Sequence, residues 1–179
     1  MILNGIVKVL KGEDDWREEF DLSAPALPKS FIAILLCTPL FMLVTMSVIK
    51  YNDNSGDAPF LAILIILGLM SFSFPLIAYV LCMVFDLQAK FRPWVIVRNW
   101  SFLVIVGLIT IAFSLNLLDL MPFSVAYNIG LTLYLSTLAL DIRLAMRIAN
   151  FDWIGAVFTA ILISATCIMI LSLGLNQAL

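Results

Sequence analysis

The sequence predicts an all-α, polytopic membrane protein with about five transmembrane helices and an N-terminal amphipathic helix at the membrane interface. The chain is 63% hydrophobic and 12% charged, with a mean hydropathy of +1.10. Soluble domains are about 45–50% apolar and about 25% charged. Spans of about 20 residues each would use most of the 179 residues, so a separate soluble catalytic domain is not expected.

Residues 1–29 are expected to lie at the cytoplasmic surface, and residues 30–179 to form the transmembrane domain. Near the start, apolar and basic residues separate onto two sides of a helix, which predicts a short interfacial helix. The apolar side holds Ile2, Ile6, Val9 and Leu10, and the other side holds Lys8 and Lys11.

An acidic stretch follows, formed by Glu13, Asp14, Asp15, Glu18, Glu19 and Asp21. Clustered carboxylates can hold a divalent cation. Charge runs are more often solvated segments, so we expect a helix or turn without a metal ion, and a break at Pro25 and Pro28.

Five apolar runs are long enough to cross a bilayer: Ser30–Ile49, Pro59–Phe85, about Trp94–Leu118, Pro122 to about Leu140, and Trp153–Leu173. The second run could be divided at Pro75. Two pieces of roughly 13 residues would each be too short to cross ~30 Å at 1.5 Å per residue, so a single tilted or kinked helix is expected.

The basic residues predict the orientation. With a cytoplasmic N-terminus, only Lys50 falls outside, and nine cations fall inside: Lys8, Lys11, Arg17, Lys29, Lys90, Arg92, Arg98, Arg143 and Arg147. This asymmetry follows the positive-inside rule. It predicts a multi-pass protein of a bacterial plasma membrane, with 88–99 as a cytoplasmic connector and Trp94, Trp100 and Trp153 at the interface.

Residue types exclude most catalytic chemistry. The chain has no histidine, which removes the commonest general base and the usual haem, copper and zinc ligands. Cys37, Cys82 and Cys167 are expected to be buried small residues, with Cys167 toward the opposite side from the other two, so that they form no single cluster. A phosphate loop and a serine elbow are also missing. We therefore expect no enzyme activity, cofactor or bound nucleic acid.

Polar residues recur every four positions in the fourth span, at Ser124, Asn128, Thr132 and Ser136. Such a row lies along one side of a helix. It predicts either a helix interface joined by hydrogen bonds or the wall of a polar pathway, and the interface is favoured. The fifth span offers small residues for close packing: Gly155, Ala156, Thr159, Ala160 and Ser164.

Pro39 and Pro75 lie at similar depths in the first two spans. Matched helix breaks near the midplane are typical of transport sites. Prolines are also tolerated as packing kinks, and this interpretation is favoured because no charged residue lies beside either proline.

Ionisable residues gather at the expected cytoplasmic ends of the spans: Asp86, Arg92, Arg98, Asp141, Arg143 and Arg147. Arg143 and Arg147 share a helix face, whereas Asp141 has no cation three or four residues further on. We expect Asp141 to pair with another segment. Inter-helix ion pairs are the first interpretation, binding of anionic lipid headgroups the second, and catalysis the last.

Three short motifs carry a family resemblance: "FDLS" at Phe20–Ser23, "SFP" at Ser73–Pro75 and "RNWS" at Arg98–Ser101. With these motifs the chain resembles small five-span bacterial membrane proteins, and its topology is similar to that of Yip1-type membrane proteins. The resemblance implies a five-helix bundle and carries over no site residue.

The expected function is that of a structural or accessory subunit, in contact with the lipid bilayer and with another integral membrane protein or complex. The alternative is a small-solute transporter or channel, acting alone or as an oligomer, that uses the region of Thr38, Pro39, Pro75 and Asn128.

Overall fold

The computed structural model describes residues 2–52 and 60–178, and the regular secondary structure in this part of the chain is entirely helical. Five helices are long and apolar enough to cross a membrane, which confirms the predicted fold class. In chain order the elements are α1 (Ile2–Lys11), the 3₁₀ helix η1 (Asp14–Glu19), α2 (Ala26–Tyr51), α3 (Phe60–Val84), α4 (Gln88–Leu117), α5 (Phe123–Arg147) and α6 (Trp153–Ala178).

Four spans are longer than the apolar runs that predicted them, and one of these is α6, which continues past Leu173 to Ala178. Helix α2 begins at Ala26, because Pro28 lies in its first turn, where a missing N–H does no harm. Helix α4 begins at Gln88, so the expected connector 88–99 is helical, and α5 continues to Arg147. Polar residues end an apolar run without ending a helix. Pro59, the expected start of the second span, lies outside the described residues.

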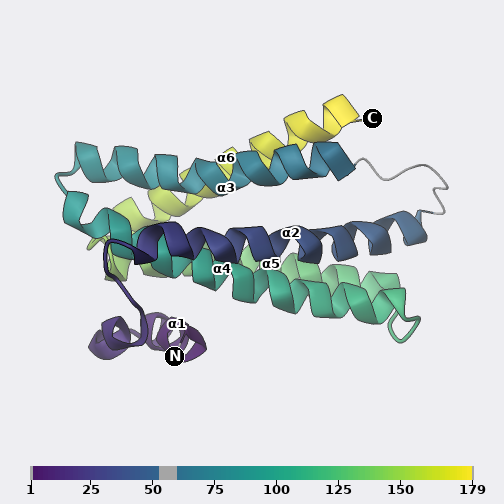
Figure 1. Cartoon of the computed structure of the whole chain (residues 1–179), viewed down its shortest axis with the longest axis horizontal. Coiled ribbons are helices and arrows are strands. Elements are labelled where there is room, and N and C mark those ends of the chain that lie inside the picture. The colour runs from purple at the N-terminus through teal and green to yellow at the C-terminus, as the bar shows by residue number, and fades with distance from the viewer. Residues whose placement is uncertain (1, 53–59, 179) are drawn as a thin grey trace.

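The five long helices form one bundle (Figure 1), and α3 and α6 pack against each other on one side of it. Helix α1, the α3–α4 turn and the α5–α6 turn lie at the same end, here called the N-terminal end; the α4–α5 turn lies at the opposite end. Of the basic residues, Lys50 near the end of α2 belongs to the opposite end. The other nine of the ten lie toward the N-terminal end.

The short turns between spans depend on Asp and Asn. Asp86, Asp119 and Asn150 have φ values of 54°, 59° and 61°, in the left-handed region. Asp and Asn enter this region more readily than most other side chains. The shape of the α3–α4 turn therefore accounts for an Asp at position 86.

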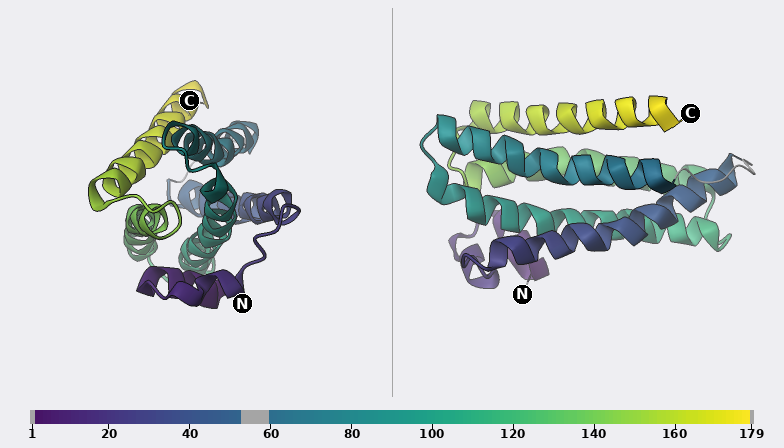
Figure 2. Two further views of the ribbon diagram at one scale, coloured as in Figure 1. Left: turned by 90° about the vertical axis from the view of Figure 1, so that its left-hand side faces the viewer. Right: turned by 45° about the horizontal axis from the view of Figure 1, so that its top comes forward.

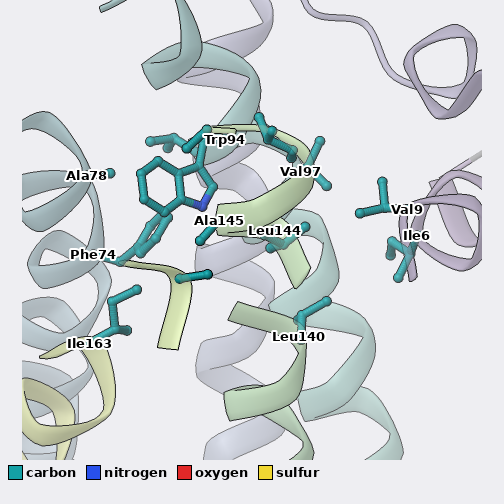
Figure 3. Close-up of a cluster of buried hydrophobic side chains, with 14 of the residues drawn as sticks. Ile6, Val9, Phe74, Ala78, Trp94, Val97, Leu140, Leu144, Ala145 and Ile163 are labelled. Carbon is teal, nitrogen blue, oxygen red and sulfur yellow. The ribbon is translucent and has the colours of Figure 1, made fainter. Parts of the chain in front are cut away.

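The main core lies toward the N-terminal end and joins helices from across the chain (Figure 3). Its largest fully buried member is Trp94 of α4, which was predicted to lie at the interface. The Trp94 ring meets Phe74 and Phe151 edge-on at centroid distances of 5.7 and 6.0 Å. Edge-to-face pairs of this kind add to the stabilisation from burial. The rest of the core includes Ile6, Val9, Ala78, Val97, Leu140, Leu144, Ala145 and Ile163.

Helix α1 is the predicted amphipathic helix, but its buried face packs on the bundle. Ile6 and Val9 are buried in the main core, and Figure 2 (left) shows α1 lying across the bundle. Leu3, Val7 and Leu10 remain exposed on the outer side. The apolar residues therefore cover two faces of α1, one directed to the bundle and one available to the membrane.

The acidic stretch after α1 forms η1, with Trp16 buried. Lys8 lies 2.8 Å from the Asp15 carboxylate and 2.9 Å from that of Glu19. The pKa of Lys8 is raised above its usual value, first by its hydrogen bond to Asp15 and to a smaller extent by that to Glu19. Both bonds stabilise the ammonium form. These contacts fold the surface segment back on α1.

Helices α2 and α4 are joined by polar contacts, which we call the α2–α4 seam. Asn99 Nδ2 donates to Ser30 Oγ over 3.0 Å, and Ser47 Oγ donates to Asn116 Oδ1 over 2.7 Å. Lys50 Nζ donates to Asp119 Oδ1 over 2.6 Å. Each pair is separated by 69 residues in sequence. Because this separation is constant, the two helices run in the same direction in a fixed register.

Candidate functional site

Arg98 and Asp141 form a buried ion pair between α4 and α5. Arg98 Nε lies 3.1 Å from Asp141 Oδ1, and Nη2 lies 3.3 Å from Oδ2. Arg98 is 9% exposed and Asp141 2%. Two parallel charge-assisted hydrogen bonds fix both the distance and the orientation of the groups. Asp141 thus has its cationic partner on another helix, as the sequence predicted.

Aromatic rings cover the guanidinium. Arg98 Cζ lies 4.2 Å from the centroid of the Phe74 ring and 5.5 Å from that of Phe102. Ring faces attract a cation, and more strongly where water is excluded. Arg98 lies ten residues after the start of α4 at Gln88, about 15 Å along the helix axis at 1.5 Å per residue. The ion pair therefore lies inside the bundle, about three helical turns from its N-terminal end.

The other charged residues of the predicted cluster do not join this pair. Arg147 Nη1 approaches Asp14 Oδ1 of η1 at 3.9 Å, and Arg92 Nη1 donates to the Leu22 carbonyl over 3.5 Å. Arg143 and Asp86 are exposed and have no ion-pair partner in the part of the chain that the structure describes. The predicted cluster is thus one buried pair with four separate residues near the surface.

The polar row of α5 faces outward. Ser124, Asn128, Thr132 and Ser136 are all exposed. Thr132 Oγ1 donates to the Asn128 carbonyl over 2.8 Å, and Ser136 Oγ to that of Leu133 over 2.6 Å. Within residues 2–52 and 60–178, the side chains of Ser124 and Asn128 make no hydrogen bond.

The prediction that this row packs on the small residues of α6 is wrong. Ala156, Thr159 and Ala160 of α6 are buried, but α5 turns a different face inward. Gly130 belongs to that inner face, where a Cβ atom would lie 2.7 Å from Phe113 Cε2 of α4. The fit of a small residue of α5, Gly130, against a bulky residue of α4, Phe113, therefore sets which face of α5 packs in the bundle. The polar row lies outside that packed face.

The two prolines do not mark a shared site. Helices α2 and α3 continue through Pro39 and Pro75. Pro39 is exposed and Pro75 half-buried, and neither lines the described cavities near the bundle centre. Asn128 does not line these cavities either.

Two neighbouring cavities lie between the helices. The smaller, of about 20 Å³, is lined by Arg98, Ser71, Cys37 and Cys167 among others. The larger, of about 270 Å³, lies between α2, α3, α4 and α5. Cys37 and Cys167 thus line one cavity, which corrects the expectation that Cys167 lies apart. Residue counting placed Cys167 on the far side, but it lies only 14 residues into α6 (167 − 153), about 21 Å along a span of more than 30 Å.

Sequence reasoning missed the α2–α4 seam. Asn99 and Asn116 are amides within an apolar segment, as Asn128 is, but they belong to no predicted row of polar residues. Such residues need a hydrogen-bonding partner in a membrane. The sequence contains this signal, but it does not reveal which helix supplies the partner.

Comparisons with protein-family models, with curated proteins and with solved structures found no match. The five apolar helices define the class of the protein: a multi-pass, α-helical integral membrane protein. The resemblance to five-span bacterial membrane proteins stays a prediction.

Proposed function

We propose that the protein is a non-catalytic structural or accessory subunit that binds another integral membrane protein through the polar row of α5. The observation that carries this proposal is the outward position of Ser124, Asn128, Thr132 and Ser136 on a membrane-spanning helix. From Ser124 to Ser136 the row rises by twelve residue steps (136 − 124), about 18 Å of helix. It is long enough to pair with a second helix over several turns.

Hydrocarbon is a poor environment for this row. A buried amide without a hydrogen-bond partner costs roughly 2–7 kcal/mol, depending on the reference state. Thr132 and Ser136 already bond to their own helix backbone, whereas the Asn128 amide has no partner among the described residues. An amide both donates and accepts, so a polar side chain on a partner helix would satisfy it.

Substitution of Asn128 by leucine tests the proposal. Asn128→Leu is expected to weaken association with the partner by about 3- to 15-fold, since hydrogen bonds between membrane helices contribute about 0.6–1.7 kcal/mol. The measurement is native separation and mass spectrometry after extraction in mild detergent. The stability of the isolated chain should not change, because the Asn128 side chain is exposed and has no hydrogen bond to another helix among the described residues.

Thr166→Val is the matched control, because Thr166 lies on another span, α6, is only partly buried, and among the described residues bonds only to the Leu162 carbonyl of its own helix. It should leave the complex intact. Recovery of the wild-type chain only as a monomer or homo-oligomer, with solute movement after reconstitution alone, would instead support the transporter or channel alternative.

We also propose a bacterial plasma membrane location with the N-terminus in the cytoplasm. Support comes from the position of nine of the ten basic residues toward the N-terminal end of the bundle. Basic residues near short loops are retained on the cytoplasmic side.

Single cysteines can test this orientation after Cys37, Cys82 and Cys167 are replaced by alanine. In intact cells, an impermeant thiol reagent is expected to label a cysteine introduced at Leu120, in the α4–α5 turn, but not one at Gln88, at the start of α4. Both positions are exposed, so accessibility within the fold does not bias the comparison. Labelling at position 88 alone would reverse the orientation.

A further inference from the structure

The two central cavities have four lining residues in common: Phe41, Leu67, Met70 and Phe102. The larger cavity is therefore next to the smaller one, and Arg98 lines the smaller. An elongated molecule that filled both would have its body among α2–α5 and one end at the guanidinium.

We propose that this double cavity binds a neutral, single-chain lipid whose carbonyl oxygen accepts a hydrogen bond from Arg98. This proposal does not depend on docking through α5, because Ser124, Asn128, Thr132 and Ser136 line neither cavity.

The lining of the larger cavity selects an apolar body. It includes Ile63, Ile66, Ile105, Val106 and Ile109. The hydroxyls of Thr45 and Thr137, also in the lining, donate to backbone carbonyls of their own helices, those of Phe41 and Tyr134, over 3.0 and 2.6 Å. A polar solute would lose its hydration here and find few partners. An alkyl chain would gain from contact with the aliphatic side chains.

The ion pair selects the head group. Asp141 accepts from Nε and Nη2 of Arg98, and the guanidinium has five N–H donors. Nη1 donates to no acceptor in the described ranges 2–52 and 60–178, and it is not one of the buried polar atoms that lack a partner there, so it is not fully enclosed. Because Arg98 lines the smaller cavity, the proposal assigns this free N–H to a ligand there.

Charge distinguishes a carbonyl from a carboxylate. Arg98 and Asp141 together have no net charge, and an anionic head would also meet the negative charge of Asp141 at low effective dielectric. A carbonyl oxygen accepts the Nη1–H bond without this repulsion. The smaller cavity, of about 20 Å³, exceeds the ~10–15 Å³ needed for one water-sized group.

Photolabelling can test the site in the intact protein. The full chain is reconstituted in phosphatidylcholine vesicles with a long-chain fatty acid methyl ester that carries a diazirine in its alkyl chain. Saturable labelling is expected on lining residues such as Met70 and Phe102. The unlabelled methyl ester should compete strongly, and an alkane of equal length weakly.

Two variants separate the cavity from the outer surface. Val106→Trp places a bulky ring in the larger cavity, and saturable labelling should be lost. Leu61→Trp adds the same ring at an outward position of α3 that is 73% exposed, and labelling should persist. If Val106→Trp does not fold, Ile66→Phe fills the same cavity by a smaller change.

Labelling confined to outward-facing residues, or saturable labelling that survives filling of the cavity, would overturn the site. Equal competition by the alkane would remove the role of the Arg98 hydrogen bond. Stronger competition by the free fatty acid at neutral pH would replace the carbonyl with an anionic head. Each of the last two results contradicts the proposed ligand class.

Discussion

Asp141→Asn is expected to destabilise the protein by about 3–5 kcal/mol, because it leaves the Arg98 guanidinium buried without its counter-charge. The free energy of unfolding, measured in detergent micelles with a denaturant, would show the loss. Asp119→Asn is the matched control. It breaks the Lys50–Asp119 pair, whose carboxylate side chain is 82% exposed, and exposed pairs contribute only about 0–1 kcal/mol.

A double substitution separates charge from packing. Arg98→Met with Asp141→Leu removes both charges and keeps apolar side chains in the space, so much of the stability lost in Asp141→Asn should return. Buried ion pairs can often be replaced by apolar residues of similar volume at little cost. An Asp141→Asn variant that unfolds at the same denaturant concentration as the wild type would show that the pair does not hold α4 to α5.

Trp94→Ala is expected to cost about 3–5 kcal/mol, the usual range for removal of a large aromatic side chain from a core. Trp94 is completely buried and is in ring contact with Phe74 and Phe151. Loss of the indole would leave a cavity where α3, α4 and the α5–α6 turn meet. The same unfolding measurement applies.

Trp94→Phe should cost much less than Trp94→Ala. The Trp94 Nε1–H is buried and has no hydrogen-bond partner among the described residues, and such an unsatisfied donor costs about 1–3 kcal/mol. Phenylalanine gives up part of the volume but removes this donor. If the phenylalanine variant is as unstable as the alanine variant, the indole N–H must have a partner, such as a buried water molecule.

The number and positions of the spans could be predicted from sequence because hydropathy is a local property. An apolar segment of about 20 residues enters the membrane whatever its neighbours are. Helix ends were less predictable: Gln88–Pro93 and Asp141–Arg147 contain charged residues that interrupt the apolar pattern, yet both segments are helical.

The buried ion pair was predictable in part. A charge in a membrane span needs a partner, and the lack of a cation three or four residues after Asp141 pointed to another segment. The identity of that partner depends on how α4 packs against α5, and this packing follows from contacts such as Gly130 with Phe113. Those contacts involve residues far apart in sequence, and periodicity does not describe them.

Faces were harder to predict than elements. The spacing of Ser124 and Asn128 establishes that they share one side of α5, but it does not decide whether that side is inward. The same limit applies to α1, whose apolar residues suit either lipid or the bundle. Only the arrangement of the neighbouring helices determines whether a given helix face points into the bundle or toward lipid.

The α2–α4 seam has a consequence for synthesis of the chain. Its partners are 69 residues apart, and at about 5–20 residues per second a ribosome needs roughly 3–14 seconds to make that length. During this time Ser30 is satisfied by the Leu27 carbonyl of its own helix, 2.7 Å away. Ser47 donates to Asn116 in the finished bundle, and this hydrogen bond cannot form until α4 has been synthesised. The first span therefore spends seconds beside lipid or the insertion machinery before its lasting neighbour exists.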